Sequence, residues 1–166
     1  MPEKETLERA HEDEREGKAP STQAGEFVKE EMDHIREGKH GARSTKQAIA
    51  IGLSKARRAG VKLAPPKKGS ARTRAQAKRD YSKGQSGSRK TSAKRSQATE
   101  RALKREGRSA ASHKALSRQA RGAAKKRSAA SRHNAAVKAS RTKGSAGRKK
   151  AAQKAARTRS SRRKAA

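Results

Sequence analysis

The sequence lacks cysteine and tryptophan, and its 166 residues include one tyrosine and one phenylalanine. The absence of cysteine excludes a disulfide framework, a thiol nucleophile and a cysteine-based zinc site, and it is compatible with a reducing cytoplasm. No apolar run approaches the roughly 20 residues that a membrane-spanning helix requires. The basic runs carry almost only alanine where a membrane-surface helix carries Trp, Phe or Leu, so we expect no membrane partner. The acidic residues 1–5 are unlike the start of a secretory signal peptide.

Acidic residues are scarce after residue 66. Residues 67–166 contain 34 Lys/Arg and three acidic residues, a net charge of +31, against +32 for the whole chain. The first 40 residues have the opposite balance, with a net charge of −5. Because so basic a segment attracts polyanions, this asymmetry points to a nucleic acid as the partner.

Large apolar residues are equally scarce in the basic segment, where they amount to Tyr81, Leu103, Leu116 and Val137. A fully buried side chain of this size contributes roughly 1.5–3 kcal/mol. Ordering the backbone costs roughly 1–2 kcal/mol per residue. We therefore predict a chain that is mostly α and disordered, with a short helical hairpin followed by a long basic, largely disordered, conditionally helical tail.

Composition divides the chain into four parts. Residues 1–23 are predicted as an acidic disordered arm, 24–63 as a helical hairpin module, 64–91 as a Pro/Gly/Ser basic linker, and 92–166 as an Ala/Lys/Arg/Ser-rich basic tail. The residue before a proline avoids the helical region, so Pro65-Pro66 separates the hairpin from the rest of the linker. A sharper alternative for the arm is that it folds back on the basic tail and competes with nucleic acid.

Glycines punctuate the tail. Gly107, Gly122 and Gly144 stand where helix stops should be, after runs of alanine, lysine and arginine, which are good helix formers. We expect these runs to become helical once a polyanion neutralises their charge.

The first helix of the hairpin is predicted from an apolar stripe. Val28, Met32 and Ile35 are spaced i, i+4, i+7, with Phe27 beside them. Gly38 is placed to end this helix.

The second helix is predicted from a capping-box pattern, with Ser44 as the N-cap and Gln47 three residues later. Ile49, Leu53 and Ala56 continue the i, i+4, i+7 spacing, and Gly60 fits the position just beyond the helix end. About nine large apolar side chains do not offset the entropy of about forty residues, so we expect the hairpin to form a homodimer or to dock on a protein partner.

The sequence contains no pattern typical of catalysis. His34 and His40 stand near Asp33, but their spacing is irregular for zinc, which takes defined ligand spacings. No phosphate-binding loop or nucleophile elbow is present. We therefore expect no enzyme, no catalytic residue, no metal, no cofactor and no small-molecule substrate.

The basic residues form an inventory for binding phosphate. A charge of +31 could neutralise on the order of 15 base pairs of duplex DNA, and engaging about eight phosphates gives a log–log salt slope of about −7. Single-strand binding usually requires aromatic stacking platforms, and Tyr81 is the one aromatic residue of residues 67–166. The predicted nucleic-acid contacts are Arg57, Arg58, Lys62, Lys67, Lys68, Arg72, Arg74, Lys78, Arg79, Lys125, Lys126, Arg127, Arg148, Lys149, Lys150, Arg162, Arg163 and Lys164.

Two stretches carry a resemblance to known proteins. Residues 26–41 and 44–60, including the element KQAIAIGLSKARRAG at 46–60, resemble an uncharacterised family of small basic bacterial proteins that often have an Ala/Lys/Arg tail. That family is a domain of unknown function, so the resemblance implies little about activity. The tail resembles bacterial histone-H1-like nucleoid proteins and the basic extensions of small ribosomal proteins, although it lacks the proline of the H1 type.

These observations predict a bacterial, nucleoid-associated, histone-like DNA-binding protein of the cytoplasm, which binds and compacts duplex DNA without sequence specificity. Two alternatives stay open. In the first alternative, the chain is an RNA- or ribosome-associated protein. In the second the hairpin recognises a protein and the tail is a polyanion anchor.

Overall fold

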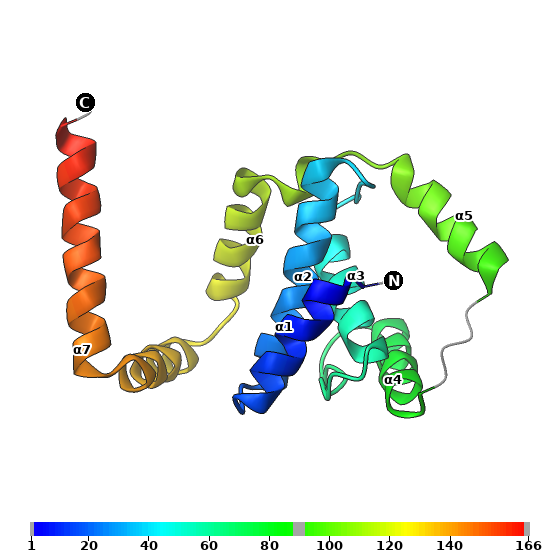
Figure 1. Ribbon diagram of the computed structural model, residues 1–166, viewed down its shortest axis with the longest axis horizontal. Helices are drawn as coiled ribbons and strands as arrows, with labels where there is room; N and C mark the ends of the chain where they lie inside the picture. The colour runs from blue at the N-terminus through cyan, green and yellow to red at the C-terminus, as the bar shows by residue number, and fades with distance from the viewer. Residues whose placement is uncertain (1, 88–91, 165–166) are drawn as a thin grey trace. The chain divides into compact units, whose positions relative to one another are not determined.

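The computed structural model describes residues 2–87 and 92–164, without the side chains of residues 143 and 162–164. The chain falls into two compact units, Met1–Gln119 and Ala120–Ala166, each described by itself below. Figure 1 shows the elements in chain order: α1 (Lys4–Arg15), α2 (Pro20–Glu37), α3 (Thr45–Arg58), α4 (Ala71–Gln85), α5 (Ala93–Lys104), the short 3-10 helix η1 (Ser109–Ala111), α6 (His113–Lys125) and α7 (Ala129–Lys164).

Helices α2 and α3 form the hairpin that the apolar pattern predicts, and they pack against each other. Helix α2 begins at Pro20, where a missing N–H costs nothing. It ends at Gly38, whose φ of 82° is the left-handed conformation that glycine adopts most readily. The N–H of Lys39 then donates to the carbonyl of His34 at 3.0 Å and closes the helix end.

The predicted cap begins α3. The Ser44 hydroxyl accepts a hydrogen bond from the N–H of Gln47 at 3.3 Å. The Gln47 side chain reaches back as expected, but it accepts from the N–H of Arg43, at 2.9 Å, one residue before the cap. The reciprocal bonds thus fix the chain direction where the loop enters α3.

Small residues line the face of α3 that meets α2. Ala48, Gly52 and Ala56 are spaced i, i+4, i+8 and are buried. A Cβ at Gly52 would lie 2.7 Å from the Cα of Val28, so the two backbones approach more closely than a side chain would permit. Ile49 and Leu53, the larger residues of the predicted stripe, are partly buried beside this face.

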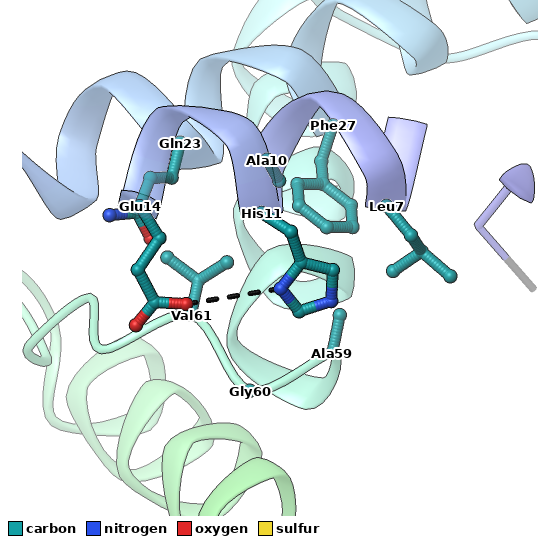
Figure 2. Close-up of a pocket in the computed structure, with 9 residues that line it drawn as sticks. All are labelled: Leu7, Ala10, His11, Glu14, Gln23, Phe27, Ala59, Gly60 and Val61. Atoms are coloured by element: carbon teal, nitrogen blue, oxygen red, sulfur yellow. Dashed lines mark ion pairs between the residues drawn. The ribbon is translucent and has the colours of Figure 1, made fainter. Parts of the chain in front are cut away.

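Helix α1 packs on α2, so the disorder expected for the acidic arm is not found. Leu7 and Ala10 of α1 lie against Phe27, which is fully buried (Figure 2). This contact shields the largest apolar side chain of the hairpin from water.

The arm also forms polar contacts with the hairpin. The Glu3 carboxylate accepts hydrogen bonds from His34 Nε2 at 2.8 Å and from Lys39 Nζ at 3.0 Å. These bonds lower the pKa of Glu3 to about 2, because they favour the ionised carboxylate. Further along, Glu14 lies 3.5 Å from Lys62. The acidic arm therefore pairs with the hairpin module.

Helix α4 packs against α3 and is attached through a buried carboxylate. Asp80, 1% exposed, accepts hydrogen bonds from Ser54 Oγ and Arg58 Nε at 2.7 Å each and from Gln76 Nε2 at 2.9 Å. A Cβ at Gly84 would lie 1.8 Å from the carbonyl oxygen of Arg57, so glycine permits this helix crossing.

The segment around η1 covers the other half of the hairpin. Ala110 and Ala111 are buried against Met32 and Ile35, with Leu116 partly buried beside them. Their backbone carbonyls are paired, because Thr45 Oγ1 donates to Ala110 at 2.7 Å and Arg36 Nε donates to Ala111 at 3.2 Å.

The loop between α2 and α3 holds the chain that precedes η1. The N–H of Gly41 donates to the carbonyl of Leu103 at 2.9 Å, and the N–H of Ala42 donates to that of Gly107 at 3.1 Å. A Cβ at Gly41 would lie 1.9 Å from the carbonyl oxygen of Glu106, so the two backbones are in direct contact.

The predicted fold class, a hairpin with a largely disordered tail, is therefore wrong. The described part of the tail is helical, and α4 and η1 belong to a helical bundle with α1, α2 and α3. The prediction considered only large apolar residues as a source of buried area and left out the contribution of alanine. Buried small residues such as Ala77, Ala110 and Ala111, together with the hydrogen bonds of Asp80, attach these segments where large side chains are missing.

The second unit is helical without a core. None of its described residues is buried, so its helices depend on the intrinsic propensity of alanine, lysine and arginine and on local caps. The Ser128 hydroxyl accepts from the N–H of Ser131 at 3.1 Å. Helix α7 breaks at Gly144, which has φ 63° and ψ 179°, as its predicted stop requires. Gly122, another predicted stop, lies within α6.

Candidate nucleic-acid interface

The predicted contacts on the hairpin, Arg57 and Arg58, form bonds within the fold. Arg57 is 8% exposed, and its guanidinium donates to the carbonyls of Leu63 at 3.1 Å and of Leu53 and Ala64 at 3.5 Å. Burial lowers the pKa of Arg57, because it penalises the charged form. Arg58 is half exposed and is bonded to Asp80. We infer that both residues hold α3 and the chain after it in place.

The next group surrounds the start of α4 and faces solvent. Lys62, Lys67 and Lys68 lie in the extended segment between α3 and α4 and are exposed. Lys62 is 3.5 Å from Glu14, and its side chain is 69% exposed, so this pair is weak in water.

Four predicted residues lie on α4, namely Arg72, Arg74, Lys78 and Arg79, and all are exposed. The helix turns Ala77 and Asp80 toward α3, which leaves these cations on its other sides. Arg72 and Arg79 are seven residues apart, so they lie on one row of the helix. Sequence reasoning missed Lys83, which continues this row and is exposed.

Lys125, Lys126 and Arg127 lie at the end of α6 and in the segment before α7, and all three are exposed. Arg127 donates to the Ser131 carbonyl at 3.3 Å. These residues are adjacent in sequence, so they present three charges within one turn of chain.

Arg148, Lys149 and Lys150 follow the break in α7 and are exposed. Arg148 reaches back across the break to the carbonyl of Ser140 at 2.9 Å. The last predicted contacts lie in the final turn of α7, and their side chains are outside the described part of the structure: Arg162, Arg163 and Lys164.

Helix α6 carries a row of cations of which sequence reasoning singled out Lys125 alone. Lys114, Arg118, Arg121 and Lys125 are spaced i, i+4, i+7, i+11, which places them on one side of a helix. Eleven residues of helix span about 16 Å, and about five base pairs of duplex rise the same distance at ~3.4 Å each. The spacing of this row could have been found from the sequence, once a helix is assumed.

Charge of one sign dominates the second unit. Residues 120–166 contain 17 Lys/Arg and no acidic residue, whereas the described bundle has its cations interleaved with carboxylates. Carboxylates that pair with cations reduce their attraction for phosphate. The second unit is therefore the part of the chain best suited to hold a polyanion.

A small pocket lies between α1 and the turn that follows α3 (Figure 2). Phe27, Leu7 and Val61 line it, and its one ion pair joins His11 to Glu14 at 3.8 Å. The His11 side chain is largely exposed and that of Glu14 is half exposed. Among the described residues, no helix is long and apolar enough to cross a membrane.

The comparisons with known proteins concern the hairpin. Residues 19–68 match a family of unknown function (DUF6496). The match covers α2, α3 and the extended segment after them, and it confirms the resemblance to an uncharacterised family. It leaves α1 and every element from α4 onward outside. No curated protein and no solved structure matches the chain.

Proposed function

We propose that this chain binds duplex DNA without sequence specificity and compacts it, as a nucleoid-associated protein of the bacterial cytoplasm. The observation that carries the proposal is the unbroken positive charge of residues 120–166 on helices whose described residues are not buried. Such an array gains affinity by releasing the counterions condensed on DNA.

The helical form of the tail bears on how it would bind. The major groove of B-DNA admits an α-helix, and a segment that is already helical has less conformational freedom to lose on binding. The break at Gly144 divides α7 into two lengths, which can follow the duplex in two directions.

The absence of sequence preference follows from the same feature. Reading bases requires side chains held in fixed positions against the groove. In the second unit no described residue is buried, so no packed core holds its cations against a groove, and hydrogen bonds such as that from Arg148 to the carbonyl of Ser140 are local. Contacts to phosphate alone carry no sequence information.

The test is a salt series of binding isotherms by fluorescence anisotropy, with two duplexes of equal length and unrelated sequence. We expect equal affinities for the two and a log–log salt slope of about −7, for about eight engaged phosphates. A preference of tenfold or more for one duplex, on the order of 1.4 kcal/mol, would contradict nonspecific binding.

A pair of triple variants locates the interface. Lys125, Lys126 and Arg127 are replaced by glutamine in the first variant, and Arg15, Lys29 and Lys46 in the second. Both sets hold two lysines and one arginine, and none of the six residues is buried. We expect the first to reduce the salt slope by about 3 × 0.9, or close to three, and the second to leave it nearly unchanged. An equal loss in both would show that binding follows net charge and does not depend on the tail.

Competition of labelled duplex DNA with structured RNA at one salt concentration separates the proposal from its first alternative. A strong preference for RNA would replace DNA as the partner.

A further inference from the structure

A cluster of three metal-ligating side chains lies where α2 meets the loop that follows it. Glu31 and His34 are three residues apart on α2, and His40 comes from the loop after Gly38. Each offers one ligand atom, and these atoms lie within 4.8 Å of one another. The left-handed Gly38 turns the chain back and brings His40 to the helix, although its sequence spacing from His34 is irregular for zinc.

Glu31 is the unusual member of the cluster. It is 0% exposed, and neither carboxylate oxygen has a hydrogen-bond partner. Its ionic neighbours are His40 Nε2, 3.3 Å from Oε1, and Lys55 Nζ, 2.7 Å from Oε2, and neither meets it with the geometry of a hydrogen bond. Lys55 balances the charge at Oε2, whereas Oε1 is buried without a hydrogen-bond donor and is suited to coordinate a cation.

The hydrogen bonds of the two histidines orient their rings. His40 Nδ1 is 3.1 Å from the carbonyl of Gly41, and a carbonyl only accepts, so this nitrogen carries the proton. In the neutral ring the lone pair is then on Nε2, which faces Glu31 Oε1. Nε2 of His40 and Oε1 of Glu31 thus face each other at 3.3 Å, so one ion can take both as ligands.

His34 is oriented in the same way. Its Nε2 is 2.8 Å from the ionised carboxylate of Glu3, which only accepts, so the lone pair of the neutral ring is on Nδ1. A histidine that binds a metal usually donates its other ring N–H to a carboxylate or to a backbone carbonyl. Here the Glu3 carboxylate is the partner of His34, and the Gly41 carbonyl is the partner of His40.

We propose that Glu31, His34 and His40 bind one Zn²⁺ ion, through Glu31 Oε1, His40 Nε2 and the unprotonated ring nitrogen of His34. Two imidazoles and one carboxylate are a known ligand set for Zn²⁺, with a fourth position open to water. Zinc bonds of about 2.0–2.2 Å place neighbouring ligand atoms roughly 3.5 Å apart. The distance between Glu31 Oε1 and His40 Nε2 is 3.3 Å, and all the ligand atoms of the cluster lie within 4.8 Å of one another. Lys55 retains Oε2, so the carboxylate keeps a cation on both sides.

The ion ties α2 to the loop at 38–41 and, through Glu3, to the start of α1. The proposal does not depend on nucleic-acid binding, because the site lies in the bundle and uses no residue of the cationic tail.

The test titrates the untagged full chain with Zn²⁺ by calorimetry at pH 7.5, and with Co²⁺ while recording the visible spectrum. We expect one tight equivalent of Zn²⁺, a rise in the thermal midpoint, and Co²⁺ bands typical of tetrahedral nitrogen and oxygen ligands. His34→Gln and His40→Gln should each weaken Zn²⁺ binding by at least tenfold, and Glu3→Gln should weaken it by about tenfold through the orientation of His34.

His11→Gln is the matched control, since His11 lies on α1 and is largely exposed. It should bind Zn²⁺ like the natural chain. Circular dichroism of each metal-free variant shows whether it is folded, and a folded His40→Gln that still binds a tight equivalent would overturn the proposal. Absence of a tight equivalent in the natural chain would overturn it too, and the cluster would then be a buried ion-pair network only.

Discussion

Gly52 is the residue at which α2 and α3 come into backbone contact. The atoms that a methyl group at this position would meet include backbone atoms of Phe27 and Val28, at 3.0 and 2.7 Å, and these cannot rotate away. Side-chain packing around the site is already complete, because Ala48 and Ala56 on either side are fully buried. One hydrogen atom at residue 52 therefore sets the distance between the two main helices.

We predict that Gly52→Ala destabilises the bundle by about 1–3 kcal/mol, because inserting a methyl group into a filled contact forces the helices apart. Urea unfolding followed by circular dichroism measures the loss. Gly25→Ala is the control: Gly25 is on α2 with open space around its Cα. That substitution should raise the free energy of unfolding by up to about 1 kcal/mol, through helix propensity. Equal effects of the two substitutions would show that the close contact has no energetic importance.

At the scale of elements, the helical hairpin could be predicted from the sequence, but the segments that pack over its apolar face could not. The spacing of Met32 and Ile35 and the cap at Ser44 are local patterns, and a helix with an apolar face must bury it somewhere. The sequence did not show that Ala110 and Ala111 fill that role. Alanine occurs throughout the tail, so its composition does not distinguish the two that dock from those that stay exposed.

The helix α4 illustrates the same limit. Asp80 is one of three acids in a segment with 34 cations, and composition predicts that it is solvated. In the structure it is buried and receives three hydrogen bonds, two of them from α3. These two hydrogen bonds come from Arg58 and Ser54, which are 22 and 26 positions away in the sequence. No periodic pattern in the sequence links residues that far apart. The exposure of the cations was easier to predict, because a charged side chain is rarely buried. Arg57 is the exception, since it is buried, and Arg58 is half exposed and bonded to Asp80. That the exposed cations contact nucleic acid stays a prediction.

We predict that Asp80→Asn loosens α4 from α3 and costs about 1–3 kcal/mol, because a neutral amide leaves Arg58 without its charged partner. Tyr81, the one tyrosine of the chain, is adjacent and makes its fluorescence a local probe of α4. The control Glu100→Gln removes an exposed pair with Lys104, which should cost a few tenths of a kcal/mol. Unchanged tyrosine emission and stability in Asp80→Asn would contradict this account of α4.

At the scale of the whole molecule, the two units respond to salt for opposite reasons. In the bundle, opposite charges attract, both in local pairs such as Lys18–Asp13 and in pairs distant in sequence such as Lys39–Glu3. In the second unit every charged side chain is positive, so its helices form against repulsion. Screening weakens both effects.

We predict that raising NaCl from about 10 mM to about 300 mM increases helical content, since the Debye length falls from ~30 Å to below 10 Å and repulsion in the tail is relieved. Circular dichroism at 222 nm measures the gain. The emission of Tyr81, in the bundle, should change little over the same range. A loss of helical signal with salt would mean that the attractive pairs of the bundle dominate the response.

The contact between residue 41 and the chain at 103–107 has a consequence for how this protein can vary. Gly41 touches its partner through main-chain atoms on both sides, with its N–H on the carbonyl of Leu103 and its missing Cβ against the carbonyl of Glu106. A main chain is nearly the same whatever side chains it bears. Mutational tolerance across this contact is therefore one-sided: substitutions can accumulate at 103–106 without loosening the joint, whereas position 41 accepts glycine alone.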